Sequence, residues 1–128
     1  MPDWTIQVEP MRGRLLGWID RPTQVIHVRE GITQAQRRVV LCHEHEHILR
    51  GHDGHCRPTI ELDIDKTVAC YLIPLPSLVD AFRWSWHVTE IAEHLWVTRR
   101  CVLTRFKYLT DDEAAEIRAA LGDVEKTA

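Results

Sequence analysis

The chain has 128 residues, of which 45% are apolar and 27% are charged. This composition excludes a disordered chain and a membrane-embedded protein, and it suffices for one domain with a modest core. The formal net charge of −3 at pH 7 gives no overall basic field, so any contact with nucleic acid would need a local basic patch. We expect residues 1–128 to form a single domain.

The N-terminal stretch MPDWTIQVEP lacks the basic run and apolar segment of a signal peptide, and no later apolar run is long enough to span a membrane. The four cysteines fall in no paired framework. We expect a cytoplasmic protein without a membrane partner. In a reducing compartment its thiols stay free, at Cys42, Cys56, Cys70 and Cys101.

The segment GRLLGWIDRPTQVIHV, residues 13–28, predicts a small sheet. Apolar and polar side chains alternate in its second half, which is typical of a strand with one buried face. We expect strands at about residues 13–19 and 23–28. A turn at Asp20, Arg21 and Pro22 would join them.

Two helices are predicted next. The first has Thr33 as its N-cap, runs from Gln34 to about Arg50 and stops at Gly51. The segment TIELDIDKTVACYLI, residues 59–73, predicts the second, which the prolines of the following PLP sequence close.

The remaining chain is also predicted to be helical. Three helix starts are indicated by N-terminal helix signals, at Ser77, Thr89 and Thr98. Thr110 and Glu113 form a capping box for a C-terminal helix that stops at Gly122.

The first predicted helix contains the pattern H-E-x-x-H at His43, Glu44 and His47. Because a helix advances about 100° per residue, residues four apart lie on nearly the same face, so two imidazoles can share one metal ion. His45 points to the opposite side and is interpreted as a packing or surface residue. Glu44 and Glu46 flank the metal face almost symmetrically, so periodicity does not identify the general base; the known use of the motif assigns Glu44.

A catalytic zinc ion needs a third protein ligand and one position left open for water. Several nearby side chains could supply the ligand: His52, His55, Cys56, Glu61, Asp63 and Asp65. The extended pattern H-E-x-x-H-x-x-G-x-x-H is not met, because Arg50 and Asp53 stand where it requires glycine and histidine.

The ELDID segment of the second helix offers another solution. Glu61 and Asp65 are four residues apart, so both can face the first helix. One carboxylate can then bind the metal while the other orients a ligating histidine through its free ring nitrogen. Asp63 points elsewhere, so we predict Glu61 as the ligand and Asp65 as the supporting residue. The competing interpretation is an ordinary solvated acidic face.

Residues 89–109, TEIAEHLWVTRRCVLTRFKYL, carry the spacing of a helix-turn-helix. Its second helix would present Arg99, Arg100, Arg105 and Lys107 to DNA. DNA contact is not favoured, because the chain is acidic and no flexible linker precedes the segment; a helical pair packed on the remaining domain is the favoured interpretation. A third interpretation is a surface that docks a protein substrate through Trp84, Trp86 and Trp96.

The segments RRVVLCHEHEHILRG and ELDIDKTVACYLIP resemble the ImmA/IrrE family of metallo-endopeptidases, in particular its short versions from actinobacterial phages and mobile elements. In that family an H-E-x-x-H helix is followed by an E-x-x-x-[DN] helix that ends in an apolar L-I-P segment. The matching positions are His43, Glu44, His47, Glu61, Asp65, Leu72, Ile73 and Pro74. With the strands and the tail, the resemblance covers nearly the whole chain.

The chain also departs from the family pattern. His45 stands where many relatives have a small residue, and Val68 stands where they have alanine. The loop that contains His52, His55 and Cys56 is unusually rich in metal-binding side chains, which could compete for the ion or protect it.

The resemblance implies an α+β fold of the HExxH zincin type. A small N-terminal β-sheet would pack on the zinc-binding helices within residues 1–76, and residues 77–128 would form a helical tail with the helix-turn-helix-like pattern. It implies a gluzincin-like site in which His43, His47 and Glu61 bind Zn²⁺ or Mn²⁺, Glu44 is the catalytic base and Asp65 supports a ligand. The donor that stabilises the oxyanion stays open among Tyr71, His87, His94 and Tyr108.

The resemblance further implies a function. The substrate would be a transcriptional repressor encoded beside the protease on a phage or mobile element, and its cleavage would lift repression in the bacterial host cell. The alternative is a metal-stabilised regulatory protein that binds DNA or a repressor without cleaving anything. A toxin or antitoxin component is a weaker third hypothesis. The sequence carries no signal for an oligomeric state.

Overall fold

The computed structural model describes residues 3–52 and 57–127, without the side chains beyond Gly122. The chain divides into two compact units, Met1–Val68 and Ala69–Ala128. The boundary falls inside a helix, α2 (Pro58–Leu72). A single domain covering both units stays a prediction. His55 and Cys56 lie outside the described residues.

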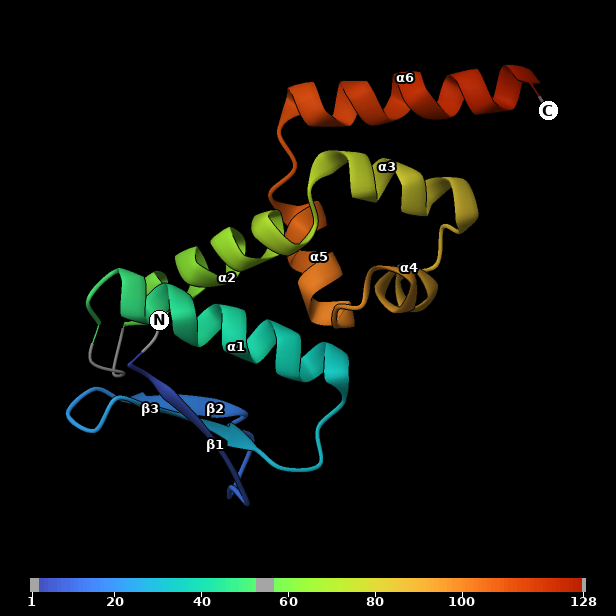
Figure 1. Cartoon of the computed structure of the whole chain (residues 1–128). Coiled ribbons are helices and arrows are strands. Elements are labelled where there is room, and N and C mark those ends of the chain that lie inside the picture. The colour runs from blue at the N-terminus through green and yellow to red at the C-terminus, as the bar shows by residue number, and fades with distance from the viewer. Residues whose placement is uncertain (1–2, 53–56, 128) are drawn as a thin grey trace. The chain divides into compact units, whose positions relative to one another are not determined.

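The first unit contains a three-stranded sheet in the order β1-β3-β2 (Figure 1). Strand β1 (Thr5–Glu9) runs parallel to β3 (Val25–Arg29), and β2 (Gly17–Asp20) runs antiparallel to it. The two predicted strands are confirmed, although β2 is shorter than expected. Strand β1 was not predicted, although Ile6 and Val8 alternate with polar residues along it; both side chains are about half exposed in the fold.

Helix α1 (Gln34–Leu49) lies along one face of this sheet (Figure 1). Ile26 and Val28 alternate with His27 along β3, so their side chains face the helix. They form a buried cluster with Ile19 of β2 and Val40 of α1. These contacts secure the sheet against the helix that carries the H-E-x-x-H motif.

Gly17 in β2 permits the close approach of strand and helix. A Cβ atom at this position would lie 2.6 Å from Cγ1 of Val40 and 3.0 Å from the carbonyl oxygen of His27. The first distance is shorter than real Cβ atoms adopt and the second is tighter than most, so a larger residue would push β2 away from α1. Gly17 therefore sets the spacing between the edge of the sheet and the motif helix.

The predicted ends of α1 are confirmed. The Thr33 hydroxyl accepts a hydrogen bond from the Gln36 backbone, and the Gln36 side chain accepts one from the Thr33 backbone, which completes a capping box. At the other end, Gly51 has a φ of 78°, the left-handed conformation that glycine adopts without strain. Local signals in the sequence thus determine where this helix starts and stops.

The second unit is helical. It contains α3 (Leu75–Trp84), α4 (Val88–Leu95), α5 (Arg99–Lys107) and α6 (Asp111–Thr127), with α3 contacting both α4 and α6. Its buried side chains include Leu78, Ile91 and Val102. Short helices with an apolar face each need such neighbours to be stable.

Three helix boundaries in this unit were predicted wrongly. Helix α3 begins at Leu75 rather than Ser77, because proline is tolerated in a first helical turn, where a backbone N–H has no partner in any case. Helix α4 follows His87, so Thr89 lies inside it. Helix α6 continues past Gly122, since a single glycine lowers helix stability by only about 1 kcal/mol.

The other two predicted caps are confirmed. The Thr98 hydroxyl accepts a hydrogen bond from the Cys101 backbone at 3.1 Å. Thr110 and Glu113 form the predicted capping box, with both hydrogen bonds at 3.1 Å. Cys42, Cys70 and Cys101 are free thiols, as expected. Within the part of the chain that the structure describes, no helix is long and apolar enough to cross a membrane.

Arg105 is buried and cannot serve the role suggested by the helix-turn-helix pattern. Its side chain is 3% exposed and donates hydrogen bonds to the carbonyl oxygen of Ile73 at 2.7 Å and to Glu113 at 2.6 Å. An arginine held in this way is not available to DNA phosphates. Arg99, Arg100 and Lys107 remain exposed on α5.

The Arg105 and Glu113 pair predicts a dependence of stability on pH. The hydrogen bond from Arg105, followed by that from the Thr110 backbone, lowers the pKa of Glu113 from 4.5 to about 2. Because the folded pKa lies below the unfolded value, the stabilisation is complete above about pH 5 and is lost as the pH falls towards 2.

Glu113→Gln is therefore expected to lower the free energy of unfolding by about 1–3 kcal/mol at pH 7, with the difference shrinking between pH 4.5 and 2. Urea unfolding of both proteins across this range measures it. The matched control is Glu116→Gln, which changes an exposed glutamate on the same helix. A Glu113→Gln effect independent of pH would contradict the pairing.

Candidate metal centre

Helix α1 brings His43 and His47 to one face, as the spacing of four residues requires. Their Nε2 atoms lie 3.2 Å apart. His47 is almost completely buried, with 2% of its side chain exposed, whereas His43 is 22% exposed. Each imidazole therefore directs its Nε2 atom to the same point, which is largely shielded from solvent.

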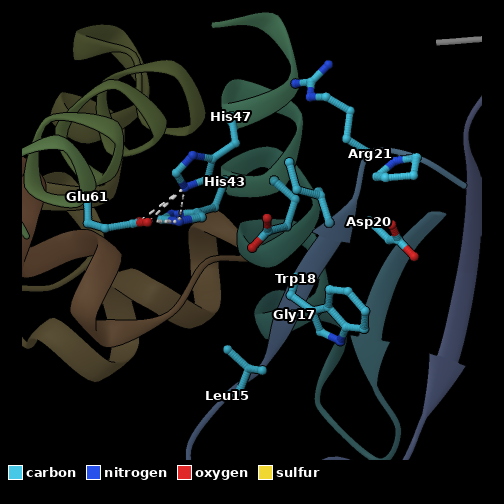
Figure 2. Close-up of a pocket in the computed structure, with 11 residues that line it drawn as sticks. Leu15, Gly17, Trp18, Asp20, Arg21, His43, His47 and Glu61 are labelled. Carbon is cyan, nitrogen blue, oxygen red and sulfur yellow. Dashed lines mark hydrogen bonds and ion pairs between the residues drawn. The ribbon is translucent and has the colours of Figure 1, made fainter. Parts of the chain in front are cut away.

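Helix α2 adds a carboxylate at this point. Glu61 places Oε2 at 2.9 Å from Nε2 of His43 and Oε1 at 3.1 Å from Nε2 of His47. One donor atom from each of these three residues lies within 4.8 Å of the others. Figure 2 shows all three side chains pointing towards one another from their helices.

The spacing of these atoms fits a divalent metal ion. Tetrahedral zinc with bonds of about 2.0–2.1 Å separates its donor atoms by about 3.3 Å. With Oε2 of Glu61 as the carboxylate donor, the separations are 2.9 Å to Nε2 of His43, 3.2 Å to Nε2 of His47 and 3.2 Å between the two nitrogens, which are close to this value. Two imidazoles and one carboxylate also form a donor set of the kind found in catalytic zinc sites, which leave one position open.

Asp65 lies behind His43, one helical turn beyond Glu61. Its Oδ1 is 3.1 Å from Nδ1 of His43, the ring nitrogen that faces away from Glu61. Asp63 instead binds Arg50 at 2.6 Å and is exposed, as expected for a residue that points elsewhere. Three acidic side chains of one short segment thus have different partners: Glu61 lies at the donor group, Asp65 lies behind His43, and Asp63 pairs with Arg50.

The two histidines differ in their electrostatic surroundings. Burial lowers the pKa of His43, but the hydrogen bond to Asp65 and the nearby carboxylates outweigh burial and raise it overall. Burial also lowers the pKa of His47, and there the attraction of Glu61 does not compensate. His47 is therefore held in the neutral form, which is the form that binds a metal.

Glu44 is buried beside these residues, with 7% of its surface exposed. Burial, followed by the negative charge of Glu61, raises its pKa to about 7, while the His43 ring acts in the opposite direction. A carboxylate with this pKa can both accept and release a proton near neutral pH.

A pocket of about 660 Å³ connects these side chains to strand β2. It is lined by Leu15, by residues 17–22, and by His43, Glu44, His47 and Glu61. Figure 2 shows the two histidines and Glu61 on one side of the pocket, and Gly17 and Trp18 on the other. The predicted site residues did not include this wall, because only tertiary contact brings it to the motif.

The structure also places the remaining candidates. His45 is half-buried and is not one of the metal-donor residues. His52 contacts His47, but among the described side chains it offers no donor atom to the same point. The four candidates for oxyanion stabilisation all belong to the second unit, as do the exposed tryptophans: Tyr71, His87, His94, Tyr108, Trp84, Trp86 and Trp96.

Comparison with known proteins identifies one family. A family model described as Peptidase_M78, the IrrE N-terminal-like domain, matches residues 4–107. The match includes the whole sheet, both motif helices and most of the helical tail. Among curated proteins, none matches the chain significantly.

Proposed function

Because the chain belongs to the IrrE N-terminal-like family of metallopeptidases, we propose that it is a zinc-dependent endopeptidase that cleaves a transcriptional repressor. The observation that carries the enzymatic part is the convergence of two imidazoles and a carboxylate beside the buried Glu44, at the wall of a pocket. The repressor as substrate rests on the resemblance to the family.

In this proposal His43, His47 and Glu61 hold the metal, and Asp65 orients His43. Bound there, zinc supplies Lewis-acid chemistry: it makes a water molecule more acidic and polarises a peptide carbonyl. Glu44 takes the proton of the attacking water and later gives it to the leaving amine. In the metal-free protein burial raises the pKa of Glu44 to about 7, and the positive charge of a bound zinc ion would favour the carboxylate form that accepts the proton.

The edge of β2 provides a place for the substrate backbone. β2 is an edge strand of the described sheet. The Arg29 N–H donates to the Leu16 carbonyl at 2.8 Å, so Leu16 and Arg29 are a hydrogen-bonded pair of the antiparallel ladder. Since alternate residues of an antiparallel pair face the partner strand, Gly17 and Ile19 turn their N–H and C=O groups away from β3. Both residues line the pocket beside Glu44. An extended peptide could add to this edge as a further strand.

This binding mode predicts an alternating effect of backbone methylation. In a peptide that spans the mapped cleavage site, N-methyl groups at every second residue should raise KM about tenfold per lost hydrogen bond. Methyl groups at the intervening residues should leave KM unchanged and so serve as the internal control. A uniform response, or none, would exclude pairing with β2.

The proposed function is tested by incubating the purified, zinc-loaded protein with the repressor encoded beside it. We expect cleavage at a defined bond, inhibition by a chelator and recovery on adding zinc. Salt-dependent retention of DNA without cleavage, unchanged in Glu44→Gln, would instead support the non-proteolytic alternative.

A further inference from the structure

The C-terminal end of α1 forms a Schellman motif that brings His52 to His47. The N–H of His52 donates to the carbonyl of His47 at 3.0 Å, and the N–H of Gly51 donates to the carbonyl of Ile48 at 3.1 Å. With Gly51 in the left-handed conformation, this motif packs the side chain two residues past the helix cap against the third residue from the helix end. Here those two side chains are both imidazoles.

The two rings meet through a specific pair of atoms. Nδ1 of His52 lies 3.0 Å from Nδ1 of His47, and the rings cross edge to face at 63° with their centroids 5.2 Å apart. The other nitrogen of His47, Nε2, faces Glu61. The ring of His47 is therefore held from both sides, with the nitrogen directed to the metal centre opposite the one that contacts His52.

Metal binding determines where the protons of this pair must lie. A neutral His47 that binds an ion through Nε2 keeps its proton on Nδ1. This N–H then donates to the Nδ1 lone pair of His52, whose own proton is on Nε2. His52 thus stands towards His47 as Asp65 stands towards His43, as the acceptor behind a ligating ring.

Arg21 secures the backbone that carries His52. Its guanidinium donates to the carbonyl oxygen of His52 at 2.8 and 3.1 Å and to that of Ile48 at 3.4 Å. Arg21 directly follows β2, so the turn between two strands holds the segment just beyond α1. The position of His52 is therefore determined by three independent contacts: the Schellman hydrogen bonds, the guanidinium and the ring of His47.

We propose that His52 is a positioning residue for His47, which fixes the tautomer and the orientation of that ring by accepting its Nδ1 proton. The inference rests on the proposed function only in taking His47 as a metal ligand. His52 acts through His47 and does not bind the ion.

The test compares zinc affinities measured by competition with a chromophoric chelator. His52→Phe keeps a flat ring but removes the acceptor, and it should weaken zinc binding about 10–100-fold. His52→Asn places an oxygen near the position of Nδ1 and should bind zinc almost as the wild type does. His45→Phe is the matched control, because His45 lies on α1 like His47 but away from the donor atoms, and it should leave zinc affinity unchanged.

Thermal unfolding of the metal-free variants separates positioning from a general loss of structure. If His52→Phe fails to fold, His52→Ala replaces it as the variant without an acceptor. Wild-type affinity in the acceptor-free variant, or equal weakening in the Asn variant, would overturn the proposal.

The outcome is distinguishable from that of the proposed function. A wild type that binds one zinc ion but cleaves nothing would overturn the peptidase proposal. The zinc affinities of the His52 variants would still decide the role of His52. A wild type that binds no zinc would overturn both.

Discussion

Replacing Glu44 with glutamine is expected to lower kcat for peptide hydrolysis by about 10²–10⁴-fold while zinc stays bound. Glutamine has nearly the shape of glutamate but cannot accept the proton of the attacking water. Because Glu44 is not one of the three residues that offer a donor atom to the metal, its replacement should leave the zinc stoichiometry unchanged. Cleavage of a mapped substrate and metal analysis of the same samples measure the two effects.

Glu46→Gln is the matched control for this experiment. Glu46 lies two residues from Glu44 on the same helix, but it pairs with Arg50 at 2.9 Å instead of lining the pocket. Loss of this pair should change stability by about 0.3–0.5 kcal/mol and leave kcat unaffected. Normal cleavage by Glu44→Gln would show that Glu44 is not the general base.

Replacing His47 with alanine is expected to remove most of the zinc affinity and to destabilise the folded protein in the presence of zinc. Structural zinc sites bind with about 10–16 kcal/mol through four ligands, so the loss of one ligand should weaken binding by about 3 kcal/mol, or roughly 100-fold. The His47 ring is also buried, so its removal leaves a cavity that lowers the stability of the metal-free protein as well.

Competition titration and thermal unfolding, each with and without zinc, separate the two contributions. His43→Ala should show a similar loss of affinity, with a smaller effect on the metal-free fold because His43 is more exposed. Glu61→Ala should weaken binding, and unchanged zinc stoichiometry there would shift the third ligand to the loop that follows α1. His45→Ala is the control that leaves zinc affinity unchanged. Full zinc binding by His47→Ala would exclude the centre built from α1 and α2.

The sequence was sufficient for those parts of the site that depend on local geometry. Hydrogen bonds between residues four apart define a helix, so the spacing of His43 and His47, and of Glu61 and Asp65, already indicated which side chains share a face. The capping signals at Thr33 and Gly51 indicated the ends of α1 for the same reason. The α+β class followed from the resemblance to the family, and the family match supports it.

Other features depend on residues that are distant in the sequence. The pairing of β1 with β3 joins two segments about 20 residues apart, and the polar and apolar alternation of residues 5–9 does not indicate which strand they pair with. Arg105 looked like a surface residue of α5, but its hydrogen bonds to Ile73 and Glu113 bury it. The periodicity of a helix predicts which residues share a face, but it does not predict which other segment that face packs against.

The sequence by itself determined the H-E-x-x-H helix, the acidic helix after it and the side chains that these two could offer to a metal. Only the tertiary structure decided that β2 forms a wall of the pocket, that burial raises the pKa of Glu44 to about 7, and that His52 contacts His47. The physical reason is the range of the interactions: helix geometry is set by near neighbours along the chain, whereas burial and ring contacts are set by whichever segments the fold brings together.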